Sequence, residues 1–291
     1  MTTISTYHDA PTNTIDVGGV SFAYRQLGPD SGTPVIFLNH LAGVLDNWDP
    51  RVVDGIAARH RVITFDNRGV GASQGTTPRS VAAMARDAVA FIRALGYDQV
   101  DLLGFSLGGF VAQVIAHDEP QLVRKLILAG TGPAGGEGID KVTPITLLDT
   151  LKATLTFKDP KEYLFFTRTS NGKAMARQFV NRLKERTDNR DKSISVTAFR
   201  NQLKAIHTWG RQKPSDLTGI QQPVLVANGD HDRMVPSSNS ADLGRRLPNA
   251  RLRLYPDAGH GGIFQYHEQF IDEALKFLDS PPASARSATT N

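Results

Sequence analysis

The sequence contains no cysteine, and this absence removes several kinds of chemistry at once. Without a thiol among 291 residues there can be no disulfide framework, no thiol nucleophile and no zinc–thiolate site. The same composition is typical of a reducing compartment, so we expect a cytoplasmic protein. A metal site would have to use histidine and carboxylates alone, and we expect neither a metal nor a cofactor.

Long hydrophobic runs and an excess of one charge are also missing. Nowhere do 18 apolar residues follow one another, and the N-terminus lacks the basic and apolar segments of a signal peptide, so we expect no membrane partner. The 33 basic and 29 acidic side chains are interspersed, as in Lys184–Lys192, and form no basic stripe. Nucleic acid is therefore not an expected partner, whereas a homo-oligomer stays possible.

What the sequence does contain is an alternation of short apolar runs with helical patterns. Segments of alternating polarity flank Gly18-Gly19, the pattern of a hairpin with a two-residue turn. Later runs are mostly continuous, as in strands covered on both faces; they occupy 34–38, 61–65, 99–103, 125–129, 223–227 and 251–255. Helical periods occupy 81–95, 107–117 and 270–278. The alternation predicts an α/β protein with a mostly parallel twisted sheet and helices on both faces.

One interval breaks this alternation. Between Ala129 and Pro223 more than 90 residues pass without a strand-like run, and so long a gap needs structure of its own. Its helical periods predict a helical lid, residues 134–213, inserted after the sixth strand. The core domain then comprises 1–133 and 214–279. Residues 280–291 are rich in Pro, Ser, Ala and Thr, and are predicted to form a disordered tail.

Ser106 stands among glycines directly after one of the predicted strands. With Gly104 and Gly108 it forms Gly-x-Ser-x-Gly between a strand and a helix, which is the context of a nucleophile elbow. So tight a turn crowds Cβ atoms against the backbone, and glycine relieves the crowding. The competing interpretation is that Ser106 only caps the following helix, a role worth about 1 kcal/mol.

A serine nucleophile needs a base, and the base needs an orienting acid. Asp230 and Asp232 follow the run 223–227, and His260 follows the run 251–255 between two glycines. Ligand sites in parallel sheets form beyond the carboxyl ends of the strands, so these side chains are expected to converge there. The chain order Ser, Asp, His is that of the α/β-hydrolases.

The sequence resembles the α/β-hydrolase superfamily over nearly its whole length, and within it the serine esterases and cofactor-free haloperoxidases. Four motifs carry the resemblance in the family's order: GFSLGG, DNRGVGAS, NGDHDRMVP and DAGHGG. The resemblance implies a catalytic triad of Ser106, Asp232 and His260. It also favours Asp232 over Asp230 as the acid, since the acid stands three residues beyond Gly229.

The resemblance further implies an oxyanion hole built from the backbone N–H groups of Leu107 and Leu41. Where the family usually has His-Gly before the second donor, this chain has Asn39-His40. Three roles for His40 stay open: a contact to substrate or oxyanion, a hydrogen-bonding brace of the loop, or an outward-facing side chain without consequence.

The resemblance therefore implies a carboxylesterase-like serine hydrolase that acts on a small apolar ester or lactone through an acyl-enzyme. The alternatives are a cofactor-free haloperoxidase or perhydrolase, a carbon–carbon bond hydrolase, and a receptor of the same fold without turnover. The candidate pocket residues are His40, Trp48, Phe105, Phe165 and Trp209. Other aromatic side chains of the lid suggest an apolar pocket lining: Phe157, Tyr163, Phe166, Phe179 and Phe199. The competing interpretation is that most of the lid aromatics only pack the lid on the sheet.

Overall fold

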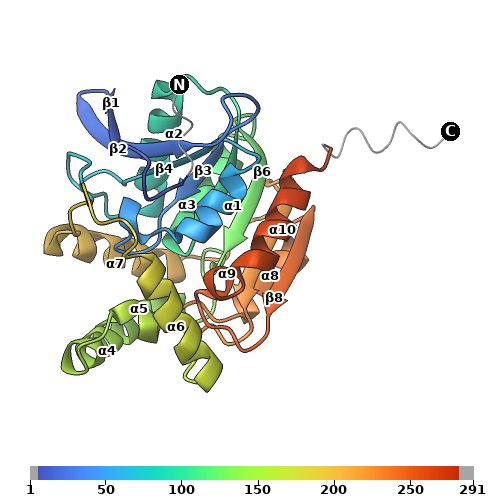
Figure 1. Ribbon diagram of the computed structural model, residues 1–291. Helices are drawn as coiled ribbons and strands as arrows, with labels where there is room; N and C mark the ends of the chain where they lie inside the picture. The colour runs from blue at the N-terminus through green and yellow to red at the C-terminus, as the bar shows by residue number, and fades with distance from the viewer. Residues whose placement is uncertain (1–5, 282–291) are drawn as a thin grey trace.

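The computed structural model describes residues 6–281, so nearly all of the predicted tail lies outside the described residues. Its centre is one eight-stranded sheet with the order β1-β2-β4-β3-β5-β6-β7-β8 (Figure 1). The strands are β1 (Asn13–Val17), β2 (Val20–Leu27), β3 (Val35–Leu38), β4 (Val62–Phe65), β5 (Val100–Phe105), β6 (Val123–Ala129), β7 (Val224–Gly229) and β8 (Ala250–Tyr255). β2 pairs antiparallel with β1 and β4, and the other neighbours are parallel. The predicted hairpin and the predicted mostly parallel sheet are confirmed.

Both faces of the central strands are covered, which explains their continuous apolar runs. Ile36 and Leu38 of β3 belong to the core on one face, together with residues of α2 and α3. Val35 and Phe37 belong to the core on the other face, with residues of α1 and α10. Because successive side chains of a strand point to opposite faces, a strand between two cores must be apolar at every position.

The helices that cover the sheet include three predicted from sequence periodicity and several that were not predicted. The covering helices and short turns are η1 (Leu45–Asn47), α1 (Pro50–Ala57), α2 (Val81–Ala94), α3 (Leu107–Asp118), α8 (Ser238–Arg246), α9 (Gly262–Gln265) and α10 (His267–Asp279). None of the helices described between residues 6 and 281 combines the length and the hydropathy that crossing a bilayer requires.

A helical insertion leaves the sheet after β6 and returns at β7, as the sequence predicts. It contains η2 (Ile139–Lys141), α4 (Val142–Leu155), α5 (Pro160–Leu164), α6 (Ser170–Arg182) and α7 (Val196–Gly210). These helices lie together beyond one end of the sheet (Figure 1). We refer to residues 134–213 as the insertion; these limits remain a prediction.

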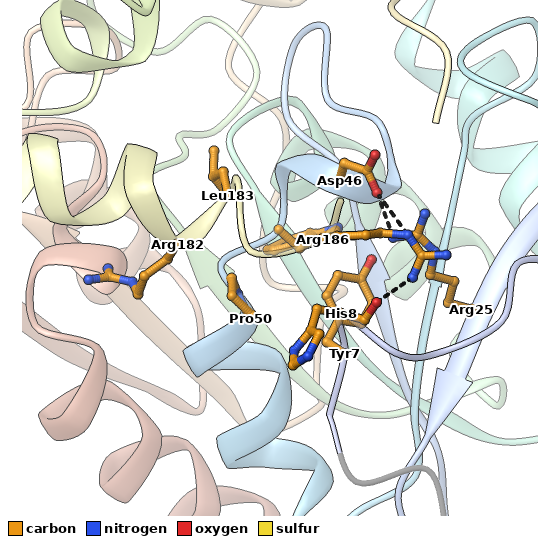
Figure 2. A pocket seen from close by; sticks show the side chains of 9 residues that line it. Tyr7, His8, Arg25, Asp46, Pro50, Arg182, Leu183 and Arg186 are labelled. Carbon is orange, nitrogen blue, oxygen red and sulfur yellow. Dashed lines mark hydrogen bonds and ion pairs between the residues drawn. The ribbon is translucent and has the colours of Figure 1, made fainter. Parts of the chain in front are cut away.

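Buried ion pairs attach the insertion to the core. Arg182 at the end of α6 donates Nε and Nη2 to the carboxylate of Asp49, which is fully buried, at 2.9 and 2.6 Å. Arg25 of β2 pairs with Asp46 at 2.7 Å, and Arg186 of the insertion approaches the same carboxylate at 3.9 Å. Figure 2 shows the two arginines converging on Asp46 around a cavity of about 10 Å³. Because each buried carboxylate has a cation beside it, the desolvation penalty of these charges is offset.

A second contact between core and insertion joins two carboxyl groups. Asp66, just after β4, accepts hydrogen bonds from the backbone N–H groups of Leu45 and Ala72 at 2.9 and 3.1 Å. The N–H of Leu45 is shared with Asp191 of the insertion at 3.3 Å. Burial raises the pKa of Asp66 well above its usual range, and the hydrogen bond to Asp191 and the charge of Asp191 raise it further.

Replacing Asp191 by Asn should therefore stabilise the protein in a pH-dependent way. Protonated Asp66 contributes stability that is fully present below its ordinary pKa near 4 and is lost as pH rises through the raised pKa. The amide introduced at position 191 carries no charge and can donate a hydrogen bond to Asp66. The variant should therefore lose less stability than the wild type as pH rises. Thermal unfolding should show no difference at acid pH and a gain of about 1 kcal/mol in the free energy of unfolding at neutral pH.

Asp188→Asn is the matched control, because Asp188 is an exposed carboxylate three residues away. It should change stability little at any pH. An Asp191→Asn effect that is the same at every pH would contradict the charge-repulsion explanation.

Candidate active site

Ser106 occupies a strained turn between β5 and α3. Its backbone has φ 56° and ψ −117°, a conformation that side chains with a Cβ rarely adopt. The turn is held by its own hydrogen bonds: the N–H of Ser106 donates to the carbonyl of Ala129 at 2.9 Å, and its carbonyl accepts from the Thr131 hydroxyl at 2.9 Å. The side chain of Ser106 makes no helix-capping hydrogen bond to α3, so the capping interpretation finds no support in the geometry.

The glycines around Ser106 permit a close approach of backbone to backbone. A Cβ added to Gly108 would lie 1.9 Å from the carbonyl oxygen of Leu38 at the end of β3. A Cβ on Gly104 would lie 2.4 Å from the carbonyl oxygen of Gly108. Any side chain at these positions would push α3 away from the sheet, so the glycines have a steric reason.

Asp232 and His260 come from the loops after β7 and β8 and form a buried pair. His260 Nδ1 lies 2.8 Å from Asp232 Oδ2, and both side chains are buried. The other oxygen of Asp232 accepts the backbone N–H groups of Met234 and Val235 at 2.8 and 3.0 Å, which fixes the carboxylate. This arrangement orients the ring so that its Nε2 is the nitrogen available for proton transfer.

Asp230, the other carboxylate of this loop, has different partners. It contacts Nδ1 of His231 at 2.5 Å and accepts the N–H of Ala258 at 3.3 Å. The side chain of His231 is 67% exposed and that of Asp230 35% exposed, and the hydrogen bond to Asp230 raises the pKa of His231. The geometry therefore pairs His260 with Asp232, whereas Asp230 pairs with His231.

Ser106 and His260 open onto one small cavity of about 30 Å³. Its wall consists of His40, Leu41, Ser106, Phe110, Val142, Leu164, Phe165, Ile206, Met234, Val235 and His260. Within residues 6–281 the Ser106 hydroxyl makes no hydrogen bond to His260, and such pairs are often looser before substrate binds. The cavity joins core and insertion, because Val142, Leu164 and Phe165 come from the insertion.

The backbone N–H groups of Leu41 and Leu107, next to this cavity, have no acceptor in the described part of the chain. Leu107 is the first residue of α3, where helical N–H groups lack an intrahelical partner. Leu41 lies in the loop after β3. The next residue, Ala42, has φ 61° and donates its N–H to Oε1 of Gln202 at 2.8 Å.

Gln202 and Thr131 were not predicted from the sequence, although both hold parts of the site. Gln202 of α7 is fully buried and ties the insertion to the loop that carries Leu41. Thr131 holds the carbonyl of Ser106. For Gln202, the only signal in the sequence was a polar residue on the apolar face of a helical period. No sequence signal pointed to Thr131.

His40 is buried, so it is not an outward-facing side chain. Its Nδ1 lies 2.7 Å from the carbonyl oxygen of Leu41, the hydrogen bond expected of a brace, whereas Nε2 is buried without a partner among the described residues. The ring packs edge-on against Phe105 and Phe165 at 5.4 and 5.2 Å. Burial, followed by the nearby charge of Lys161, lowers the pKa of His40 to about 3.

Several predicted pocket aromatics do not line this cavity. Trp48 packs against Phe37 and Phe105 and borders the small cavity beside Arg25 and Asp46 instead. Phe105 has no exposed surface. It lies behind the cavity wall, where it packs on Phe165 and His260.

Two aromatics of the insertion also differ from the expectation. Trp209 stacks on Phe110 at 5.4 Å, so it supports the wall without forming part of it. Phe157 is 98% exposed. From the predicted pocket set, His40 and Phe165 alone face the cavity.

The histidines offer a direct measurement of these environments. His40 should stay neutral from about pH 4.5 to 8.5, and His231 should titrate above the ordinary histidine pKa of about 6.5. Two-dimensional NMR of labelled histidine rings measures both, and the spectrum of His40→Gln identifies the resonance of His40. A His40 ring that takes up a proton near pH 6.5 would show that the ring is not buried as described.

Comparisons with known proteins agree with this geometry. Residues 33–265 match the family model described as the alpha/beta hydrolase fold. A solved alpha/beta hydrolase fold protein from Chitinophaga pinensis is 42% identical, with a TM-score of 0.89 over 94% of this chain and 99% of that one. The poly(3-hydroxyalkanoate) depolymerase of Ectopseudomonas oleovorans is 30% identical over 84% of each chain. The non-heme chloroperoxidase of Streptomyces lividans is 26% identical over 90% of this chain and 97% of its own.

Proposed function

Because this chain belongs to the α/β-hydrolase family, as its motifs predict, we propose that it is a serine hydrolase that cleaves carboxylic esters or lactones. One observation carries the proposal. The hydroxyl of Ser106, on a strained elbow, opens into the same cavity as His260, whose second ring nitrogen is held by buried Asp232. A nucleophile, a base and an orienting acid in this relation are the requirement for acyl transfer.

Each residue has a defined part in the proposed reaction. His260 Nε2 takes the proton of Ser106 as Oγ bonds to the substrate carbonyl carbon, and Asp232 stabilises the imidazolium. The oxygen of the tetrahedral intermediate accepts the N–H groups of Leu41 and Leu107. When the intermediate collapses, the leaving alkoxide takes the proton from His260 and Ser106 remains acylated.

Water completes the cycle by the same path. His260 removes a proton from water as its oxygen attacks the acyl carbon, and a second tetrahedral intermediate forms. Its collapse releases the carboxylic acid and returns the proton from His260 to Ser106. With a lactone, alcohol and acid leave as one molecule.

The cavity wall indicates the class of acyl group. Apart from Ser106 and the two histidines, the wall is apolar, and no lysine, arginine or carboxylate of the described residues lines it. An uncharged apolar acyl or aryl group fits this environment. A volume of about 30 Å³ holds little more than one water molecule, so the insertion must move to admit a substrate. We assign the insertion the role of a lid.

The chloroperoxidase relative supports a second candidate function, in which hydrogen peroxide replaces water as the acceptor of the acyl group. The same triad would then release a peracid, and the peracid would oxidise halide in solution. Peroxide-dependent bromination of a diketone in the presence of acetate, compared with ester turnover, separates the two activities.

Ser106→Ala should abolish turnover of p-nitrophenyl esters while leaving the protein folded. Alanine fits the elbow but supplies no nucleophile, so the rate should fall by at least about a thousandfold. A fluorophosphonate probe should label the wild type at Ser106, as located by peptide mass mapping. Ser238→Ala, at an exposed serine of α8, is the matched control and should retain full labelling and activity. An adduct on any other residue would overturn the assignment.

Phe165 should govern which acyl chains enter. Its ring covers His40 and His260 at 5.2 and 5.6 Å, so truncation opens space directly over the triad. In Phe165→Ala the kcat/KM ratio of p-nitrophenyl octanoate to acetate should rise about tenfold. Phe166→Ala is the control, because Phe166 is equally buried but packs on Phe179 away from the cavity. Equal shifts in both variants would mean general loosening of the insertion.

A further inference from the structure

Helix α4 of the insertion presents its apolar side to solvent. Its exposed large residues are Leu147, Leu148, Leu151 and Leu155, with 54, 67, 57 and 72% of their surface accessible, and Phe157 follows directly after the helix. Its buried residues are Val142, Thr146, Asp149 and Ala153, and Ile145 is partly buried against the core. A helix that packs only within its own chain shows the reverse distribution. We call the five exposed residues the α4 face.

A groove continues this face toward α7. It has a volume of about 890 Å³ and lies between α4 and α7. Its apolar residues include Leu147, Phe199 and Leu203, and its charged residues are Arg200, Lys204 and one carboxylate, Asp140. Figure 1 shows α4 at the outer edge of the insertion, far from the sheet. An apolar surface at a protruding edge indicates a contact with another protein or with a membrane.

The charge of the insertion indicates the chemistry of the partner that contacts this surface. Residues 134–213 contain sixteen lysines and arginines against eight aspartates and glutamates, whereas the rest of the chain has more acidic than basic residues. Around the α4 face, Asp149 is already paired with Arg168 and Arg233, and Glu162 with Lys158.

Four exposed basic side chains near the α4 face have no such pairing. Within residues 6–281, Lys141, Lys152, Arg200 and Lys204 have no carboxylate within ion-pair distance. Apolar side chains surrounded by unpaired cations fit an anionic lipid surface, in which leucines enter the acyl region and lysines contact headgroups.

We propose that the α4 face docks the protein on anionic lipid surfaces. The absence of a spanning segment led us to expect no membrane partner, but peripheral docking requires none. A second copy of the chain fits less well, because a self-complementary contact would bring two strongly basic insertions together. The inference does not rest on the proposed hydrolase activity, since it uses only the outer surface of the insertion.

Vesicle co-sedimentation tests the proposal with the full chain. Vesicles of phosphatidylcholine with about one third phosphatidylglycerol should bind the protein at least about tenfold more tightly than phosphatidylcholine alone, and added salt should weaken this binding. Neutralising two cations in Lys152→Gln/Lys204→Gln should lower the partition coefficient about 30-fold. Leu151→Ser/Phe157→Ser should lower it at least about tenfold. Thermal unfolding without lipid should be unchanged in both variants, because all four side chains are exposed.

The chain offers matched controls on other surfaces. Leu254 is an exposed leucine on β8, and Lys276 is an exposed lysine on α10, so Leu254→Ser and Lys276→Gln should bind vesicles like the wild type. Equal binding to the two kinds of vesicle, or full binding by the α4-face variants, would overturn the proposal. A dimer that forms without lipid and dissociates in Leu151→Ser/Phe157→Ser would also overturn it, in favour of a second copy.

Discussion

The site depends on one close contact, the approach of α3 to the end of β3 at Gly108. Since a Cβ there would lie 1.9 Å from the carbonyl oxygen of Leu38, only glycine lets the helix begin so near the sheet. The same contact brings the first N–H of α3, on Leu107, toward the loop that follows Leu38 and carries Leu41. The turn at Ser106 and the proposed oxyanion hole thus both depend on this contact, and the strain at Ser106 is retained because the packed sheet around it leaves no alternative.

Apolar and polar contacts together hold the insertion on the core. Trp209 and Phe179 of the insertion are buried in the two apolar cores that also cover the sheet. Polar contacts add to this packing: Arg182 with Asp49, Gln202 with Ala42, and Asp191 beside Asp66. Burial of apolar area is insensitive to pH and salt in this range, but paired charges are not. The charged part of this attachment can therefore respond to pH and salt, whereas the apolar part cannot.

The sequence could predict the features that depend on neighbouring residues, but not those that depend on contacts between distant segments. Strands, elbow and the order of Ser106, Asp232 and His260 depend on local signals, namely apolar runs and glycines at strand ends. The contributions of Gln202 and Asp191 depend on segments more than a hundred residues apart becoming neighbours, which no local pattern reveals. Trp48 and Trp209 were assigned to the pocket because an aromatic ring suits a wall and a core equally. The helical period of α4 predicted a helix, but it could not tell which side meets solvent.

The attachment points of the insertion lie on neighbouring strands. β6 ends at Ala129 and β7 begins at Val224, which is paired with Leu126, so the intervening segment leaves at the carboxyl end of one strand and re-enters at the amino end of its parallel neighbour. The entropy of closing such a loop grows only with the logarithm of its length, by about 0.6 kcal/mol for each doubling. Neither the pairing of β6 with β7 nor the elbow next to it therefore limits the size of what is inserted. Segments of very different length and composition could be exchanged here during evolution at little thermodynamic penalty to the sheet, and the fold can diversify over a site that stays the same.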